Sequence, residues 1–279
     1  MYKLIAIDLD MTLLDKNKNI SQKNRRAIEL AKQKGVKIVL CSGRILKGVM
    51  YFAKVLGLHD QVIVACNGAI VRDLKKNKDI YYVGLENEKS LEIARICKEN
   101  DIYYHYYFQD TMIARRLDYS SKFYYEKNKE LPKEERIDII IDDCEQTLKS
   151  CGNLITKFVI IDKDVEKVDR VREIIEKRLS GVETTKSDTN ILEVMKEGVN
   201  KKRALEFVCS YLGIDPKEIM AIGDNENDLQ MIEFAGLGVA MENAIEELKK
   251  IADFVTQSYE DDGVAKAIEK FVLGETINV

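Results

Sequence analysis

Apolar and polar residues alternate in blocks at the start of the chain, as in a strand–helix–strand unit. Residues 3–9 (KLIAIDL) form an apolar run that reaches its first acid at Asp8, which is typical of a strand buried on both faces. Ser21 can cap a helix that ends at Gly35. Strand patterns recur at 36–41 and 62–66, with a helix over about 45–56 between them. This alternation predicts a parallel sheet covered by helices.

The pattern changes near residue 83 and returns after residues 191–195. The segment between them is expected to form a different sheet, with strands at 102–108, 111–117, 137–142 and 156–162 and helices at about 87–99 and 164–179. Beyond it we expect a helix at 201–212, strands at 219–223, 237–241 and 252–256, and helices between and after them. The sequence therefore predicts an α/β fold in which 1–82 and 196–279 form one domain. Residues 83–195 are expected to be a second domain inserted into it.

Composition restricts the chemistry more than it restricts the fold. The 279 residues suit about two domains, and 44 basic against 48 acidic residues favour no nucleic-acid partner. No apolar run approaches the ~20 residues that span a membrane, and six cysteines without a C-x-x-C pair suggest a reducing, cytoplasmic setting. The presence of only two histidines argues against a His-rich metal site: we expect His59 in an exposed loop and His105 in a structural role. The chemistry is therefore expected to depend on carboxylates, lysines and hydroxyls.

Two acids follow the first predicted strand. Asp8 and Asp10 stand at its carboxyl end, where open α/β sheets bind ligands. Two carboxylates so close repel each other unless a cation or a shared proton lies between them. Mg2+ prefers oxygen ligands, so the pair suits a magnesium site. The alternative interpretation is a solvated strand end in which Asp10 caps a turn.

Further polar groups follow the later strands of the same sheet. Ser42 and Gly43 offer a hydroxyl and backbone N–H groups to an anion, although an ordinary helix cap would look the same. Lys201 stands in the first turn of a helix, where a cation opposes the helix dipole, which suggests that it neutralises a phosphate. The loop 223–228 (GDNEND) is rich in oxygen atoms, but a polar turn is the simpler alternative. Together these groups predict metal-assisted phosphoryl transfer.

In order and spacing, these motifs resemble the haloacid dehalogenase (HAD) superfamily of phosphatases, in its Cof-type branch with an inserted α/β (C2-type) cap. The matching segments are DLDMTLLD (8–15), CSGR (41–44), NGA (67–69), GVNKKRAL (198–205), GDNENDLQMI (223–232), AMENA (240–244), ADFVT (252–256) and DDGVAKAI (261–268). The resemblance implies a Rossmann-like parallel-sheet core with an α+β cap. One departure is Met11, where the family usually has glycine, so a side chain there either crowds the leaving group or needs a less usual backbone geometry.

The resemblance also implies a mechanism. Asp8 would be the nucleophile that becomes an aspartyl phosphate, and Asp10 the general acid and base. An Asp8 oxygen, the Asp10 backbone carbonyl and Asp224 would hold Mg2+, while Lys201 would grip the phosphoryl group and Asp228 would position Lys201 or metal-bound water. The remaining expected phosphate or substrate contacts are Thr12, Ser42, Gly43, Arg44, Asn67 and Asn227.

The inserted domain is expected to close over the site and to read the leaving group. Residues 103–107 (YYHYY) alternate along one strand, so one set should face the cap helices and the other the opposite face. Tyrosines there could stack on a sugar, although a structural sheet face is the simpler interpretation. We expect a small phosphorylated metabolite as substrate, with sugar phosphates as the first candidates, and a monomer or weak dimer.

Two other functions stay open on the sequence alone. A phosphosugar mutase would use the same core, and Arg115 and Arg116 are candidate contacts for its second phosphate, although they form no clear signature. A phospho-aspartate receiver module also places acids and a lysine at strand ends, but it lacks an insertion of this size. A dinucleotide-binding enzyme is disfavoured because no G-x-G-x-x-G follows a strand.

Overall fold

The structure, a computed structural model, describes residues 2–274 and separates them into two units. The first unit contains the described residues up to Gly43, Phe52–Tyr81 and those from Asn200 onward. The second unit contains Arg44–Tyr51 and Tyr82–Val199. From the sequence we expect residues 1–82 and 196–279 to form the catalytic core and residues 83–195 to form the cap. These boundaries and roles stay predictions.

A five-stranded parallel sheet forms the centre of the first unit, as expected for this fold class. Its order is β14-β13-β12-β1-β2, and every neighbouring pair is parallel. The strands are β1 (Leu4–Ile7), β2 (Lys37–Leu40), β12 (Ile219–Gly223), β13 (Leu237–Ala240) and β14 (Phe254–Val255). All four residues of β1 are fully buried, because the strand lies inside the sheet and is covered on both faces. This inner strand, between β12 and β2, therefore ends directly at Asp8.

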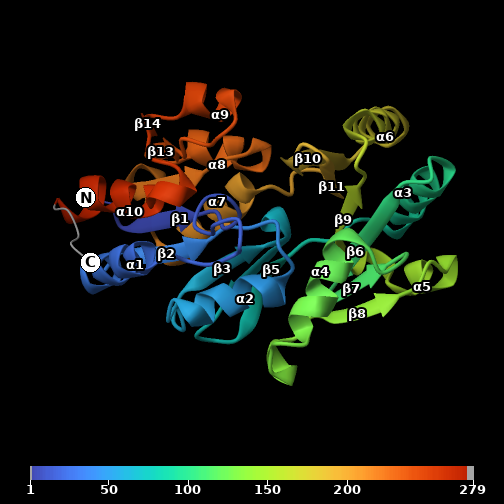
Figure 1. The fold of residues 1–279 in the computed structure, drawn as a ribbon, viewed down its shortest axis with the longest axis horizontal. Helices are drawn as coiled ribbons and strands as arrows, with labels where there is room; N and C mark the ends of the chain where they lie inside the picture. The colour runs from blue at the N-terminus through green and yellow to red at the C-terminus, as the bar shows by residue number, and fades with distance from the viewer. Residues whose placement is uncertain (1, 275–279) are drawn as a thin grey trace. The chain divides into compact units, whose positions relative to one another are not determined.

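Helices from both ends of the chain pack together in the first unit. Its helices are α1 (Gln22–Gln33), the second part of α2 (Leu46–Val55), α7 (Lys201–Leu212), α8 (Leu229–Phe234), α9 (Glu246–Ile251) and α10 (Gly263–Ile268). Ser21 caps α1 as expected, accepting a hydrogen bond from the Asn24 N–H at 3.0 Å. The Asn24 side chain accepts from the backbone N–H of Ala265 at 2.9 Å, which holds α10 beside α1 (Figure 1).

A second, antiparallel sheet continues the first unit beyond β2. It consists of β3 (Val62–Ala65), β4 (Ile70–Asp73) and β5 (Lys78–Tyr82), in that order. A parallel bridge between Cys41 and Val64 joins β3 to the end of β2. The sequence predicts β3 but gives no sign of β4 and β5, because their residues show no clear alternation.

The second unit is built on a six-stranded sheet in the order β10-β11-β9-β6-β7-β8. Neighbouring strands are antiparallel except for β7 and β8, which are parallel. Its strands are β6 (Tyr103–Phe108), β7 (Thr111–Ala114), β8 (Asp138–Ile141), β9 (Ile155–Ile161), β10 (Val182–Asp188) and β11 (Ile191–Lys196). Its helices are α3 (Asn87–Glu99), α4 (Tyr119–Asn128), α5 (Glu145–Ser150), α6 (Val165–Arg178) and the first part of α2.

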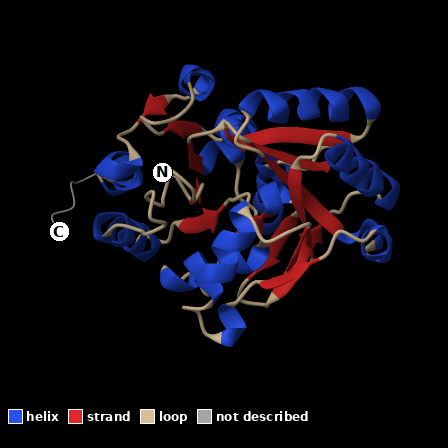
Figure 2. Cartoon of the chain, turned by 45° about the vertical axis from the view of Figure 1, so that its right-hand side comes forward, coloured by secondary structure: helices blue, strands red, loops and turns tan. Residues whose placement is uncertain are grey.

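The two faces of this sheet differ in character. On one face Tyr104 and Tyr106 join a core with Phe158 and with apolar residues of α3, α5 and α6. Figure 2 shows helices along that face of the sheet. Tyr103 and His105 point to the opposite face, because successive residues of a strand alternate. The expected alternation of residues 103–107 is confirmed, whereas α4 and α5 were not expected from the sequence.

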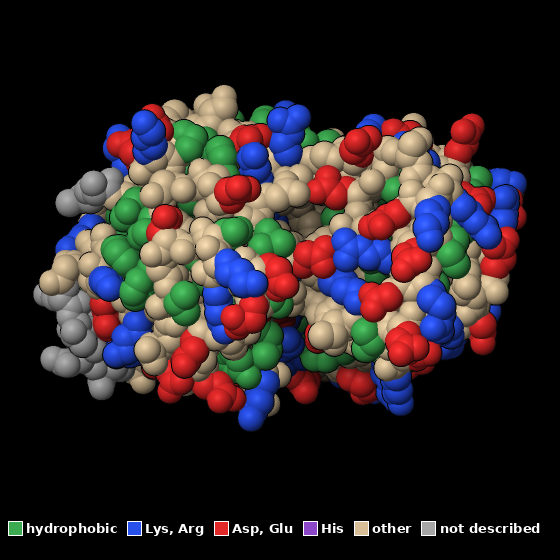
Figure 3. Space-filling view, turned by 90° about the horizontal axis from the view of Figure 1, so that it is seen from above, with side chains coloured by type: hydrophobic (Ala, Val, Ile, Leu, Met, Phe, Trp, Pro, Cys, Tyr) green, Lys and Arg blue, Asp and Glu red, His purple; other side chains and the backbone are tan. Residues whose placement is uncertain are grey.

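Three general features of the described structure concern its surface charge, the length of its helices and its cysteines. On the face drawn in Figure 3, basic and acidic side chains are interspersed without a broad patch of either sign. Within residues 2–274, no helix has the length and apolar character needed to cross a membrane. All six cysteines are free thiols, and five of them are buried.

Candidate active site

Asp8 lies at the carboxyl end of the inner strand β1, between β12 and β2. Its backbone N–H donates to the Ile222 carbonyl of β12 at 3.0 Å, so the residue is still held by the parallel sheet. The residue is only 5% exposed. The strand end therefore places a carboxylate at the edge of the sheet where loops from β12 and β2 also begin.

Lys201 joins two of the predicted acids. Its Nζ donates to Asp8 Oδ1 and to Asp228 Oδ1, each at 2.6 Å, and the residue is 1% exposed. The lysine is the first residue of α7, and the Asn200 side chain caps this helix by accepting from the Arg203 N–H at 2.9 Å. A cation in this first turn is stabilised by the two carboxylates, which outweigh the unfavourable helix dipole.

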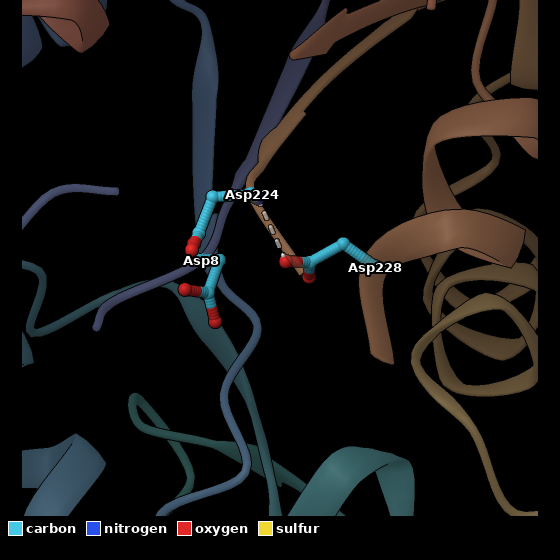
Figure 4. A group of neighbouring side chains, drawn as sticks. All are labelled: Asp8, Asp224 and Asp228. Atoms are coloured by element: carbon cyan, nitrogen blue, oxygen red, sulfur yellow. Dashed lines mark hydrogen bonds between the residues drawn. The ribbon is translucent and has the colours of Figure 1, made fainter. Parts of the chain in front are cut away.

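The loop after β12 supplies the other two acids. Asp228 Oδ2 accepts from the backbone N–H of Asp224 at 3.0 Å (Figure 4) and from that of Asn225 at 3.2 Å. Asp224 Oδ1 accepts from the Thr12 hydroxyl at 2.6 Å. Gly223 is required at this turn, because a Cβ there would lie 2.5 Å from the Asp228 carboxyl carbon. The loop thus closes tightly around the Asp228 carboxylate.

Burial dominates the electrostatics of the acid cluster. It raises the pKa of Asp8 to about 7, with Lys201 opposing this effect and Asp228 adding to it. Burial, followed by the charges of Asp8 and Asp228, also raises the pKa of Asp224 well above its usual range. Although burial disfavours the charge of Lys201, Asp228 and Asp8 raise its pKa above the usual range. One lysine therefore faces three buried carboxylates.

The acid cluster fits the divalent cation that the sequence predicts. Oxygen atoms of Asp8, Asp224 and Asp228 lie within 4.8 Å of one another. Both Asp228 oxygens already accept hydrogen bonds, whereas one oxygen of Asp8 and one of Asp224 receive none from the described residues. A cation at those two oxygens would offset the burial of negative charge. This geometry favours Asp8 and Asp224 over Asp228 as direct ligands.

Asp10 and Met11 lie at the start of the loop that follows β1. The Asp10 side chain is partly exposed, and its Oδ1 accepts from Lys18 Nζ at 2.8 Å. Met11 has φ +60°, the left-handed geometry that suits glycine, and its carbonyl accepts from the Asn243 side chain at 2.9 Å. The less usual backbone expected at Met11 is therefore present.

Five of the six predicted phosphate and substrate contacts lie in the first unit. Thr12 bonds to Asp224, so in this structure it orients a site acid. Ser42 is buried after β2; its carbonyl accepts from the Asn67 N–H at 3.0 Å, and Gly43 follows it. The Asn227 side chain donates to Asn67 Oδ1 at 3.3 Å, which joins two predicted contacts. Arg44 belongs to the second unit, and its contact with the leaving group stays a prediction.

Three supporting residues were not singled out from the sequence. Lys18 reaches Asp10, Asn243 holds the Met11 carbonyl, and Gly68 allows a close approach to the start of α7. A Cβ on Gly68 would lie 2.3 Å from the Asn200 carbonyl oxygen. Asn243 and Gly68 stand in the segments AMENA and NGA, which carry a sequence signal. Lys18 carries none, because a lysine in a polar loop is an ordinary surface residue.

Comparisons with known proteins agree with this geometry. A sequence model of the family described as haloacid dehalogenase-like hydrolase matches residues 5–268. YxeH of Bacillus subtilis is 35% identical over 279 residues, which cover 99% of this chain and 100% of that protein. The 5-amino-6-(5-phospho-D-ribitylamino)uracil phosphatase YwtE of Bacillus subtilis is 32% identical over 289 residues, covering 98% of this chain and 99% of that protein.

A solved structure shares the fold over almost the whole chain. The crystal structure of a haloacid dehalogenase-like hydrolase from Bacteroides thetaiotaomicron matches with a TM-score of 0.82 and 31% sequence identity. The match covers 97% of this chain and 99% of that chain. Both units are therefore included in the similarity.

Proposed function

Because the chain belongs to the haloacid dehalogenase-like hydrolase family, we propose that it hydrolyses small phosphomonoesters with Mg2+ and with Asp8 as nucleophile. The resemblance drawn from the motifs is confirmed, and so is the expectation of an enzyme of the phosphatase type. One observation carries the mechanistic proposal. The buried Asp8 carboxylate has one oxygen fixed by Lys201, while no described residue donates to the other.

In the first step the Asp8 carboxylate attacks phosphorus through one of its oxygens. A bond forms between phosphorus and Asp8, and the bond to the ester oxygen breaks. Asp10 gives a proton to the departing oxygen as a general acid. Lys201 donates two of its three protons to Asp8 and Asp228, so the third can reach a phosphoryl oxygen, together with the Ser42 hydroxyl.

In the second step water releases the phosphate. Water attacks phosphorus, Asp10 accepts a proton from it, and the bond between phosphorus and Asp8 breaks. Inorganic phosphate leaves and the Asp8 carboxylate is restored. Asp8, Asp224 and the backbone carbonyl of Asp10 would hold Mg2+, which would neutralise negative charge on the phosphoryl group. Asp228 keeps Lys201 oriented throughout, because its own oxygens are committed.

The proposed substrates are small phosphorylated metabolites, with sugar phosphates first among them. The relative YwtE is named for a substrate with a phosphorylated ribityl group, which supports a hydroxylated organic part. We propose that the second unit, as the cap, recognises this organic part. The family match extends over residues 83–195, which argues against a single-domain receiver module.

The test is hydrolysis of p-nitrophenyl phosphate by the purified chain. Activity is expected with Mg2+ and lost on chelation by EDTA. Asp8→Asn should abolish turnover while leaving the far-UV circular dichroism spectrum unchanged. Asp60→Asn makes the same change at an exposed loop residue and should retain activity. Full activity of Asp8→Asn would refute the nucleophile assignment, and conversion of a sugar phosphate to its isomer would favour the mutase.

A further inference from the structure

A lysine in the loop after β1 contacts one of the two acids that follow this strand. Lys18 Nζ donates to Asp10 Oδ1 at 2.8 Å, and the two side chains are 33% and 38% exposed. Ion pairs with this much exposure usually add little to folding stability, because water solvates both charges. Stability therefore explains this contact poorly, whereas Asp10 is the proposed general acid and base of the reaction.

The turn that carries Lys18 is folded around the side chain of Asp15. Asp15 Oδ1 accepts from the backbone N–H groups of Asn17 and Asn19, each at 2.8 Å. The backbone N–H of Asp15 donates to the Asn19 carbonyl at 3.0 Å, and that of Lys18 donates to the Asp15 carbonyl at 2.9 Å. These hydrogen bonds close residues 15–19 into a tight turn, which fixes the point from which the Lys18 side chain extends.

The backbone of Lys18 has an unusual conformation in this turn. Its φ is +63°, in the left-handed region that lysine seldom adopts and that asparagine adopts more readily. Asn17 and Asn19 stand on either side of it, yet the lysine occupies the strained position. Strain of this kind clusters at functional sites, where the surrounding structure holds it in place. The position of Lys18 therefore indicates a role for its side chain.

The segment between Asp10 and this turn is also held in place. A parallel bridge joins Asp10 to Leu14, and the Leu14 N–H donates to the Leu9 carbonyl at 2.8 Å. Leu14 is fully buried, so the segment is anchored in the core of the first unit. Asp10 and Lys18 thus belong to one hydrogen-bonded loop in which both backbones are restrained. The contact between their side chains then sets the orientation of the Asp10 carboxylate.

We infer that Lys18 is a positioning residue that holds the Asp10 carboxyl group in the orientation required for both proton transfers. The inference rests on the proposed function, in which Asp10 gives a proton to the departing oxygen and accepts one from water. In the acid form the proton lies on Oδ2, so Oδ1 still accepts from Lys18; in the second step Oδ2 receives the proton from water. Misplacing a catalytic group by about 1 Å can cost on the order of 100-fold in rate. Lys18 acts through Asp10, whereas Lys201 is proposed to reach the phosphoryl group itself.

The test compares two substrates that differ in their need for a proton on the leaving group. p-Nitrophenolate leaves readily as an anion, whereas the alkoxide released from benzyl phosphate needs protonation. For each variant, kcat/KM with Mg2+ is measured for both substrates, and it reports the steps up to release of the first product. Lys18→Met should lower kcat/KM for benzyl phosphate by about tenfold, a part of the roughly 10²–10⁴-fold that general acid catalysis supplies. The value for p-nitrophenyl phosphate should fall by less than about twofold.

The second step gives an independent readout. Attack by water also needs an oriented Asp10, so the aspartyl phosphate should accumulate in Lys18→Met. The fraction of the chain that carries phosphate is measured by acid quench during turnover of radiolabelled p-nitrophenyl phosphate. This fraction should be larger in Lys18→Met than in the wild type.

Three more variants separate this role from a structural one. Lys18→Arg keeps a cationic donor and should recover most of kcat/KM for benzyl phosphate. Lys18→Gly removes the side chain but relieves the strained φ, so its urea midpoint should be no lower than that of the wild type. It should nevertheless lose about tenfold on benzyl phosphate. Lys16→Met is the matched control in the same loop, where Lys16 Nζ lies 3.8 Å from Glu260 Oε1 and the lysine side chain is 70% exposed. It should leave kcat/KM unchanged for both substrates.

The outcomes separate this inference from the phosphatase proposal. A wild-type chain that hydrolyses neither substrate with Mg2+ would refute the proposed function, and this inference with it. In an active enzyme, an equal loss on both substrates in Lys18→Met, or no loss on either, would refute the inference alone. An unchanged fraction of phosphorylated chain in Lys18→Met would refute it as well, and so would a loss on benzyl phosphate that Lys18→Arg does not reduce.

Discussion

The raised pKa of Asp8 leads to a prediction about folding stability that does not depend on turnover. Asp8 is buried, its pKa is about 7 in the folded chain, and its ordinary value is 3.8. The folded state therefore keeps this proton to a higher pH than the unfolded state does. The stability associated with the protonated carboxyl is fully present below about pH 3.8 and is lost as the pH rises through about 7. Asp8→Asn removes this titration while keeping an oxygen that can accept from Lys201.

The size of the effect follows from the two pKa values. A difference of about 3 corresponds to about 4 kcal/mol at about 1.4 kcal/mol for each pKa unit. Part of this loss occurs below pH 5, so between pH 5 and pH 8 the wild type should lose roughly 2–3 kcal/mol relative to Asp8→Asn. Asp224 also has a raised pKa, in part because of the Asp8 charge, so its shift is smaller in Asp8→Asn and its contribution changes the difference between the two chains in the same direction.

The assay is urea denaturation in EDTA at pH 5, 6.5 and 8, followed by circular dichroism and tyrosine fluorescence, since the chain has no tryptophan. The Asp8→Asn stability should exceed that of the wild type increasingly as the pH rises. Asp60→Asn is the control: Asp60 is exposed and its pKa is lowered by a hydrogen bond from Gln61, so it stays ionised over this range. Parallel pH curves for Asp8→Asn and wild type would refute the reasoning. Adding Mg2+ should stabilise the wild type more than Asp8→Asn.

Three further predictions concern the support of the site. Lys201→Met leaves the Asp8 and Asp228 carboxylates buried without their cation. It should lower the free energy of unfolding, measured by urea denaturation, by about 3–5 kcal/mol. A loss below about 1 kcal/mol would contradict the role given to the lysine. Gly223→Ala should reduce phosphatase activity and thermal stability, because its Cβ would overlap the Asp228 carboxylate. The control, Gly35→Ala, has open space around its Cβ but φ +82°, so it should cost only about 1–2 kcal/mol of backbone strain. Equal losses of stability in the two variants would argue against the close contact at Gly223. Met11→Val should be less stable than Met11→Gly by about 1–2 kcal/mol, because a β-branched residue tolerates φ +60° poorly. The denaturation midpoints of the two variants measure this difference. Equal midpoints would show that the backbone at this position is unstrained.

Several parts of the fold follow from local sequence signals. The buried apolar runs at Leu4–Ile7 and Ile219–Gly223 became neighbouring parallel strands, and α3 spans Asn87–Glu99 as its pattern predicts. Local patterns failed where the signal was weak or mixed. Helix α4 (Tyr119–Asn128) is rich in aromatic and polar residues without a clear apolar stripe, and the hairpin of β4 and β5 has no regular alternation.

The sequence by itself determined which chemical groups stand at the ends of the strands of the parallel sheet. It placed Asp8, Lys201 and Asp224 there because strand ends and helix starts are local features, and the motifs around them are specific. Only the tertiary structure decided which oxygen of each acid is committed, because this depends on contacts between residues as far apart as Thr12 and Asp224 or Lys201 and Asp8. It likewise decided that His105 is buried without a partner beside Lys157 and Glu193, since three strands must pair in register to bring them together. Long-range pairing and desolvation set these properties, and neither can be read from residues close together in the chain.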